Sequence, residues 1–387
     1  MSATLTAPAS AKEWSDAVVK HRLGGQSIHS AELASASKMG FNQFLLCRVL
    51  WHKHTEHRSL STKLQIKDSL KHAGKMLEEL KSWSTYLDSF QSTKFIPEGT
   101  FAIPRKHQLE VETTKLEADP ASFNTPIAAR TRSKTQRSLN YEQTPSRKPR
   151  SDNAATFRTP VAETTSGDSL GVEEDDESTP PEEHEPTPFN PDTPIPPELV
   201  SVLFPPTIDE QIVNSALVTF LDAITLHFGL SSSWTLHRIP FTAVFKTAQF
   251  EARTDGYLRD RSGKPSVIIE VKPVIRVHNL VPIQIQETAQ MVAWIKSDDD
   301  QAQRRHTTRL HVAQDRNQIF VMVAEYGQEY LDYLNDRPSS SPLRPRPAFL
   351  TMHQYGPWNT QRPEHMRELG PLLLAITMRA DGEDTGN

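Results

Sequence analysis

The residues best suited to chemistry are two acids and a lysine at the ends of two short apolar segments. Asp255 ends the first segment, and Glu270 and Lys272 stand two residues apart at the end of the second. Because side chains alternate along a strand, Glu270 and Lys272 would face the same side of a sheet. An acid and a base at the end of a buried strand are costly unless they are paired or bind a metal. This spacing therefore predicts either an ion pair or a metal site.

The chemistry that fits these residues is metal-dependent hydrolysis of a phosphodiester. Mg²⁺ prefers hard oxygen ligands, which the carboxylates of Asp255 and Glu270 and the carbonyl of Val271 would supply. A bound ion neutralises charge on a phosphate and makes a water nucleophilic, and Lys272 could stabilise the transition state or orient that water. The alternative is a simple ion pair between Glu270 and Lys272, which would leave Asp255 as an extra acid at the same place.

Polar residues on the following helix and beside Asp255 extend the candidate site. Gln286 and Gln290 lie one helical turn apart and share a face. They could contact a phosphate backbone or the attacking water, or they could form a solvent-exposed face. Arg253 and Tyr257 flank Asp255 on the same expected strand side, where they could bind nucleic acid or merely edge the sheet.

The elements that must position these residues follow from apolar periodicity. An apolar face with two acids near its start predicts a helix over about 208–228. Strands are expected at about 234–246, 248–258 and 266–272, a helix at 283–296, a buried strand at 319–324, a weaker strand at 348–353 and a last helix at 363–379. This order predicts an α/β fold.

These motifs resemble those of the PD-(D/E)XK nuclease superfamily. Thr254-Asp255 followed by Glu270-Val271-Lys272 is similar to its core motif, with Thr254 where the family has Pro. Gln286 to Gln290 resembles the glutamine motif of several branches, and Glu210 matches an extra acid that some branches use. The resemblance covers about residues 200–380 and is nearest to nuclease-like domains of uncharacterised fungal proteins. It implies a restriction-endonuclease-like αβββαβ core with a mixed central sheet.

The resemblance also implies roles for these residues. Asp255, Glu270, the Val271 carbonyl and Glu210 would bind Mg²⁺ or Mn²⁺. Lys272 and Gln286 would complete the catalytic set with the two core acids by assisting and positioning the water. We therefore expect a nuclease acting on nucleic acid, specifically DNA, with Gln290, Arg253 and Tyr257 as nucleic-acid contacts.

The rest of the chain predicts a helical region and a disordered linker before the nuclease-like domain at 199–380. Residues 1–110 read as helical, most clearly at 61–90 and again at 31–52, and could bind a protein partner. Residues 111–198 are rich in Pro, Thr and acids and have no apolar periodicity, so we expect disorder. Residues 381–387 would be a flexible tail.

One short stretch before the linker has metal-like spacing. Cys47, His52, His54 and His57 lie close together in the sequence. On a helix, however, His52 and His54 would point in nearly opposite directions, so a solvent-exposed helix end is the favoured interpretation.

Charge patterning bears on partner and location. A basic cluster at 130–150 could be a nuclear-import signal, a nucleic-acid contact or a solvated linker. Together with the single cysteine and the lack of a secretory signal, it predicts an intracellular, nuclear protein without a membrane span. Residues 201–380 carry 19 Lys and Arg against 18 acids, so the domain is nearly neutral, whereas DNA binders usually show a basic face. Two alternatives thus stay open: a catalytically inactive fold that binds nucleic acid or protein, and a purely structural interaction protein.

Overall fold

A computed structural model describes residues 5–92, 95–114, 207, 209–298, 308–338 and 347–383 of the 387-residue chain. Residues 1–119 and 195–387 fall into one compact unit, to which the following description applies. The basic cluster at 130–150, and all of the expected linker except residues 111–114, lie outside the described residues. None of the helices in the described ranges combines the length and the apolar character needed to cross a membrane.

The fold is α/β, with a mixed central sheet that has helices on both faces. Within the described residues, seven strands form this sheet in the order β1-β9-β8-β7-β6-β5-β2. They are β1 (Val49–His54), β2 (Ser233–Thr235), β5 (Gly256–Arg259), β6 (Pro265–Lys272), β7 (Thr308–Asp315), β8 (Gln318–Glu325) and β9 (Leu350–Asn359). The β6–β7 and β1–β9 pairs are parallel and the others antiparallel. Helix α10 (Leu280–Ser297) makes the crossover that a parallel β6–β7 pair requires.

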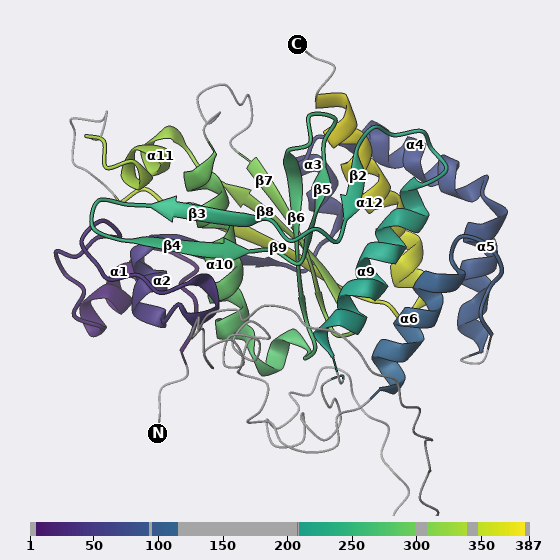
Figure 1. Ribbon diagram of the computed structural model, residues 1–387, viewed down its shortest axis with the longest axis horizontal. Coiled ribbons are helices and arrows are strands. Elements are labelled where there is room, and N and C mark those ends of the chain that lie inside the picture. The colour runs from purple at the N-terminus through teal and green to yellow at the C-terminus, as the bar shows by residue number, and fades with distance from the viewer. Residues whose placement is uncertain are drawn as a thin grey trace, which may run out of the picture. The chain divides into compact units, whose positions relative to one another are not determined.

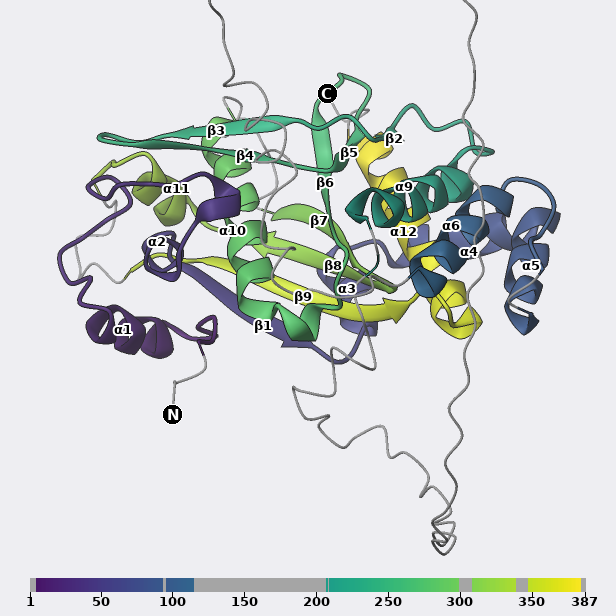
Figure 2. The ribbon, with the colours of Figure 1, turned by 60° about the horizontal axis from the view of Figure 1, so that its bottom comes forward.

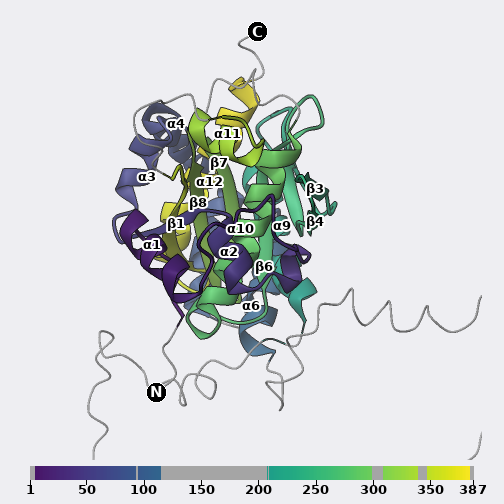
Figure 3. The same cartoon turned by 90° about the vertical axis from the view of Figure 1, so that its left-hand side faces the viewer.

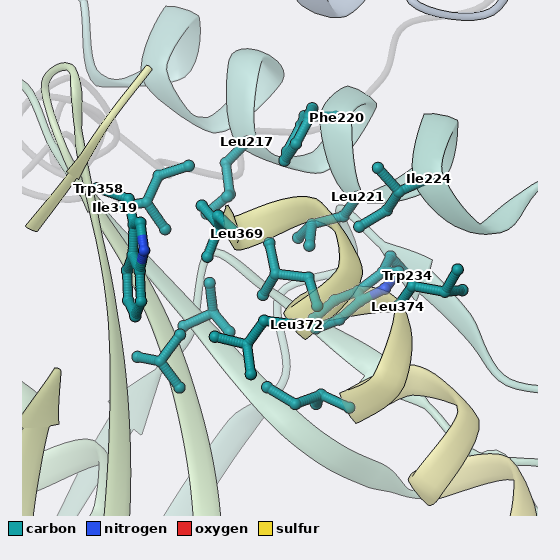
Figure 4. Close-up of a cluster of buried hydrophobic side chains, with 14 of the residues drawn as sticks. Leu217, Phe220, Leu221, Ile224, Trp234, Ile319, Trp358, Leu369, Leu372 and Leu374 are labelled. Atoms are coloured by element: carbon teal, nitrogen blue, oxygen red, sulfur yellow. The ribbon is translucent and has the colours of Figure 1, made fainter. Parts of the chain in front are cut away.

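One face of the sheet packs against α9 (Glu210–Thr225) and α12 (Pro363–Glu383), together with helices from the N-terminal region (Figures 1 and 2). Those helices are α3 (Arg58–Lys63), α4 (Lys67–Glu78), α5 (Lys81–Asp88) and α6 (Ala102–Thr113). Figure 4 shows part of the core of this face, to which Phe220 and Leu221 of α9, Leu369 of α12 and Trp358 of β9 all belong.

The other face packs against α10, a separate two-stranded sheet and the short helix α11 (Gln328–Leu334). The two-stranded sheet pairs β3 (Pro240–Val244) with β4 (Gln249–Arg253), and it lies on α10 as Figure 3 shows. Helices α1 (Ala11–Lys20) and α2 (Phe41–Leu46) lie on the same side. Alternation along β6 divides its side chains between the two cores, because Ile269 faces α9 while Ile268 faces α10.

The expectation of a separate helical N-terminal region is wrong in two respects. Residues 49–52 of the expected 31–52 helix belong to strand β1, which pairs in parallel with β9 at one edge of the sheet. Helices α3 to α6 share one core with α9 and α12. Trp51 of β1 also donates a hydrogen bond from Nε1 to Thr288 Oγ1 on α10, at 3.1 Å. A strand at a sheet edge takes its hydrogen bonds from a distant segment, so local periodicity did not reveal it.

The two strands expected at 234–246 and 248–258 are each broken. Residues 236–239 separate β2 from β3, and Thr254 and Asp255 separate β4 from β5. The break lets one stretch of chain serve two sheets. It brings β5 close to β2, where a Cβ on Gly256 would lie 2.5 Å from the Thr235 carbonyl oxygen. A side chain does not fit there, so the sequence after Asp255 requires glycine.

The helices around residues 210 and 290 and the buried strand at 319–324 are confirmed as α9, α10 and β8. Strand β9 is longer than expected, and α12 extends through residues 381–383, the first part of the expected flexible tail. Strand β7 and helix α11 were not predicted from the sequence.

Candidate metal centre

Three carboxylates converge beside the C-terminal part of β6. Glu210 comes from the first turn of α9, Asp255 from the β4–β5 junction and Glu270 from β6. Each offers an oxygen within 4.8 Å of an oxygen of the other two. Asp255 and Glu270 are buried, whereas the side chain of Glu210 is 28% exposed. We refer to these three residues as the candidate metal centre.

Backbone hydrogen bonds fix Asp255 beside the end of β6. The Asp255 N–H donates to the Ile269 carbonyl at 2.9 Å, and the Val271 N–H donates to Asp255 Oδ2 at 3.1 Å. The Asn214 amide donates to the Asp255 carbonyl at 3.0 Å. The break between β4 and β5 therefore positions the Asp255 carboxylate beside β6, with Oδ2 and not Oδ1 bonded to the β6 backbone amide.

Lys272 lies within the acidic group and bonds to two of its members. Its Nζ donates to Glu270 Oε1, to Glu210 Oε1 at 3.0 Å and to the Val271 carbonyl at 3.0 Å. Burial by itself lowers the pKa of Lys272, but the charges of Glu270, Glu210 and Asp255 outweigh it and raise that pKa above its ordinary value. Lys272 is therefore a fixed positive charge and not a proton acceptor. The expected ion pair with Glu270 is present, but it shares Lys272 with Glu210.

Negative charge is in excess at Glu270. Its pKa is raised well above the ordinary value, first by burial and next by the charge of Asp255, against the opposing effect of Lys272. A buried carboxylate in this situation is relieved by a further cation. The chemistry of the donor set, three carboxylates and a backbone carbonyl, fits a hard divalent ion.

The glutamines of α10 bind Glu270, so a purely solvent-exposed helix face is the wrong interpretation. Gln286 donates from Nε2 to Glu270 Oε1, and Gln290 donates to Glu270 Oε2. Gln290 is fully buried and also donates to the Arg253 carbonyl at 2.8 Å. With Lys272, these donors hold the Glu270 carboxylate in one orientation.

Arg253 and Tyr257 do not share a strand, because the chain breaks between them. Arg253 ends β4, where its side chain is 59% exposed and bonds to Glu251 at 2.8 Å. Tyr257 lies in β5 of the central sheet and is partly buried. The flanking positions expected around Asp255 therefore belong to two different sheets.

Sequence reasoning missed two residues that contact Asp255. Arg238, between β2 and β3, donates a hydrogen bond from Nη2 to Asp255 Oδ1 at 2.6 Å. No local pattern marked this loop residue. Asn214 follows Glu210 by one turn of α9, so the helical spacing from Glu210 could have indicated it.

A second group of buried charges lies where α10 packs on the sheet, and we call it the Arg276 cluster. Arg276 lies in the short turn after β6 and is only 3% exposed. Its guanidinium binds both carboxylate oxygens of Glu287, one oxygen of Asp315, and Gln354 Oε1 at 2.9 Å. Burial raises the pKa of Glu287 to about 7, although Arg276 opposes the shift. The cluster ties the segment after β6 to α10 and β7, the elements on either side of the candidate metal centre.

Of the histidines that follow Cys47, His52 and His54 lie on strand β1, whereas His57 directly precedes helix α3. His52 is paired in register with His353 of β9, and His54 bonds to His353 Nδ1 at 2.9 Å. His353 in turn bonds to Glu325 at 3.0 Å, and Cys47 is buried away from them in the core. Among the described residues, only Glu210, Asp255 and Glu270 converge as a group of three that could hold a metal ion.

Comparisons with known proteins gave no match: no family model, no curated protein and no solved structure is similar to this chain.

Proposed function

We propose that the chain is a Mg²⁺- or Mn²⁺-dependent nuclease that acts on DNA. The observation that carries this proposal is the convergence of three carboxylates and Lys272 beside the end of strand β6. The elements also occur in the order expected of a restriction-endonuclease-like PD-(D/E)XK core: α9, antiparallel strands ending in β6, α10, and β7 parallel to β6.

Each residue has a role that follows from its contacts. Glu210, Asp255, Glu270 and the Val271 carbonyl would hold the ion, which supplies charge neutralisation and an activated water when bound. The ammonium of Lys272 would stabilise negative charge developing on the phosphate. Gln286 and Gln290 hold Glu270, and Gln286, which is partly exposed, also orients the water.

The test is cleavage of linear, nicked and branched DNA by the whole chain, since the N-terminal helices share the core of the domain. Asp255→Asn and Glu270→Gln are expected to abolish Mn²⁺-dependent cleavage. Lys272→Met is expected to lower kcat by about 10²–10³-fold, the usual effect of removing one group that stabilises transition-state charge. Glu251→Gln, an acid-to-amide change at an exposed site on β4, is the matched control.

Cleavage that persisted in a double variant lacking Asp255 and Lys272 would contradict these roles. The substrate class is open to the same assay, with RNA as a parallel arm.

The near-neutral charge of residues 201–380 favours one second candidate, a metal-free binding module for nucleic acid or protein. Calorimetric titration with Mn²⁺ separates the two. Binding that disappears in Asp255→Asn supports the nuclease, whereas no binding by the unmodified chain supports the module.

A further inference from the structure

Arg238 has an unusual position at the candidate metal centre. Its side chain is 57% exposed, yet its guanidinium reaches the side chain of Asp255, which is only 7% exposed. It donates to Asp255 Oδ1 at 2.6 Å and, more weakly, to the Thr254 carbonyl at 3.4 Å. An exposed cation therefore covers the open side of a buried acid.

Arg238 occupies the Asp255 oxygen that accepts no backbone hydrogen bond, which is the more accessible of the two to a metal ion. Asp255 Oδ2 accepts the Val271 N–H, which leaves Oδ1 as the oxygen without a backbone donor. A guanidinium has only donors and does not lose its proton, so it cannot share this oxygen with a divalent cation by becoming neutral. Two cations a few ångströms apart at a partly buried site repel each other by several kcal/mol. Metal binding at Asp255 therefore requires Arg238 to leave.

Arg238 differs in this respect from Lys272. Lys272 is 15% exposed and is held by two carboxylates and a carbonyl, so it is the less free of the two cations to move away. Arg238 has one carboxylate partner and an exposed side chain, so it can turn outward without exposing an apolar surface. The planar fork of its donors matches the two non-bridging oxygens of a phosphodiester.

We propose that Arg238 occupies the metal-facing oxygen of Asp255 in the free protein and transfers to a phosphate of the bound DNA when a metal ion enters. The first half of this proposal is independent of catalysis, and the second half rests on the proposed function. Arg238 would thereby couple metal binding to substrate binding, because metal binding releases the guanidinium that contacts the phosphate.

The experiment uses the whole chain with Arg238→Met, which keeps length and removes charge, and Arg238→Lys. Exposed Arg367→Met on α12 is the matched control. Titration calorimetry with Mn²⁺ alone is expected to show about tenfold tighter binding in Arg238→Met, which corresponds to about 1.4 kcal/mol. Arg238→Lys keeps the charge and is expected to bind Mn²⁺ much as the unmodified chain does.

The second readout is affinity for a short DNA duplex in Ca²⁺, measured against salt concentration. Arg238→Met is expected to bind more weakly, with the salt slope reduced by about one phosphate contact, and to lower kcat in Mn²⁺. Unchanged Mn²⁺ affinity in Arg238→Met, or no Mn²⁺ binding in either protein, overturns the proposal. An unchanged salt slope overturns its second half.

Failure of the proposed function gives a different pattern. If the unmodified chain binds Mn²⁺ and DNA but cleaves nothing, the nuclease proposal fails. Tighter Mn²⁺ binding and a reduced salt slope in Arg238→Met would still support the exchange at Asp255.

Discussion

The candidate metal centre and the Arg276 cluster are two groups of buried charges with the same excess of acid. The first sets Glu210, Asp255 and Glu270 against Lys272 and Arg238, and the second sets Glu287 and Asp315 against Arg276. In each, the acids outnumber the bases by one. Net charge therefore does not separate a site that can bind a ligand from one that holds the fold together.

Solvent exposure and the convergence of the carboxylates do distinguish the two groups. In the Arg276 cluster the three side chains are at most 3% exposed, and one guanidinium fills the space between both acids. At the candidate metal centre, Glu210, Lys272 and Arg238 keep contact with solvent, and the three carboxylates point at one another. Solvent-exposed members, more than total charge, therefore mark the group that an ion and a phosphate can reach.

The largest expected effect is on stability, in the closed cluster. Arg276→Met leaves Glu287 and Asp315 buried without their cation, so it should lower the free energy of unfolding by about 3–5 kcal/mol. Chemical denaturation measures this. The matched change at the open site, Arg238→Met, should lower the free energy of unfolding much less. Equal losses in the two variants would contradict this difference between the sites.

Glu287 of the closed cluster should also contribute to the pH dependence of stability. Because burial raises the pKa of Glu287 to about 7, the folded state favours its protonated form. Its stabilising contribution is complete below the unfolded pKa near 4.5 and is lost as the pH rises through about 7. The free energy of unfolding of Glu287→Gln, relative to that of the unmodified chain, should thus rise by on the order of 3 kcal/mol from pH 4 to pH 8. Parallel denaturation series at both pH values would show it, and a constant difference would contradict it.

A divalent ion should stabilise the protein through the open site alone. At a Mn²⁺ concentration about 100-fold above Kd, the gain is about 2.7 kcal/mol. Thermal unfolding should show the gain in the unmodified chain and in Glu287→Gln, but not in Asp255→Asn. A gain that survived in Asp255→Asn would place the ion elsewhere.

The smallest expected effect is that of Asp255→Asn on the metal-free protein. The amide keeps an oxygen for the Val271 N–H. It weakens the ion pair with Arg238 but removes a charge that opposes ionisation of Glu270, so these two changes offset each other. The free energy of unfolding should change by less than about 1 kcal/mol. A loss as large as that in Arg276→Met would mean that the acids at this site are structural.

Much of the candidate site followed from local spacing. Alternation of side chains along a strand places Glu270 and Lys272 on the same side of β6. The spacing of one helical turn places Gln286 and Gln290 on the same face of α10, where both bind Glu270. These are properties of neighbouring residues, and backbone geometry alone sets them. The buried strand β8 was predictable for the same reason, since its apolar run is uninterrupted.

Only the tertiary structure decided which distant groups meet. It joined β1 to β9, broke the chain at Asp255 so that β4 and β5 enter different sheets, and placed Arg238 on Asp255 Oδ1. It also buried Arg276, whose charge alone suggested the surface. Strand pairing and side-chain contacts between segments more than a hundred residues apart depend on how the core packs. The local pattern of apolar residues carries no information about them. Local spacing thus indicates which polar residues share a strand or a helix face, and the fold sets which of their charges remain open to solvent.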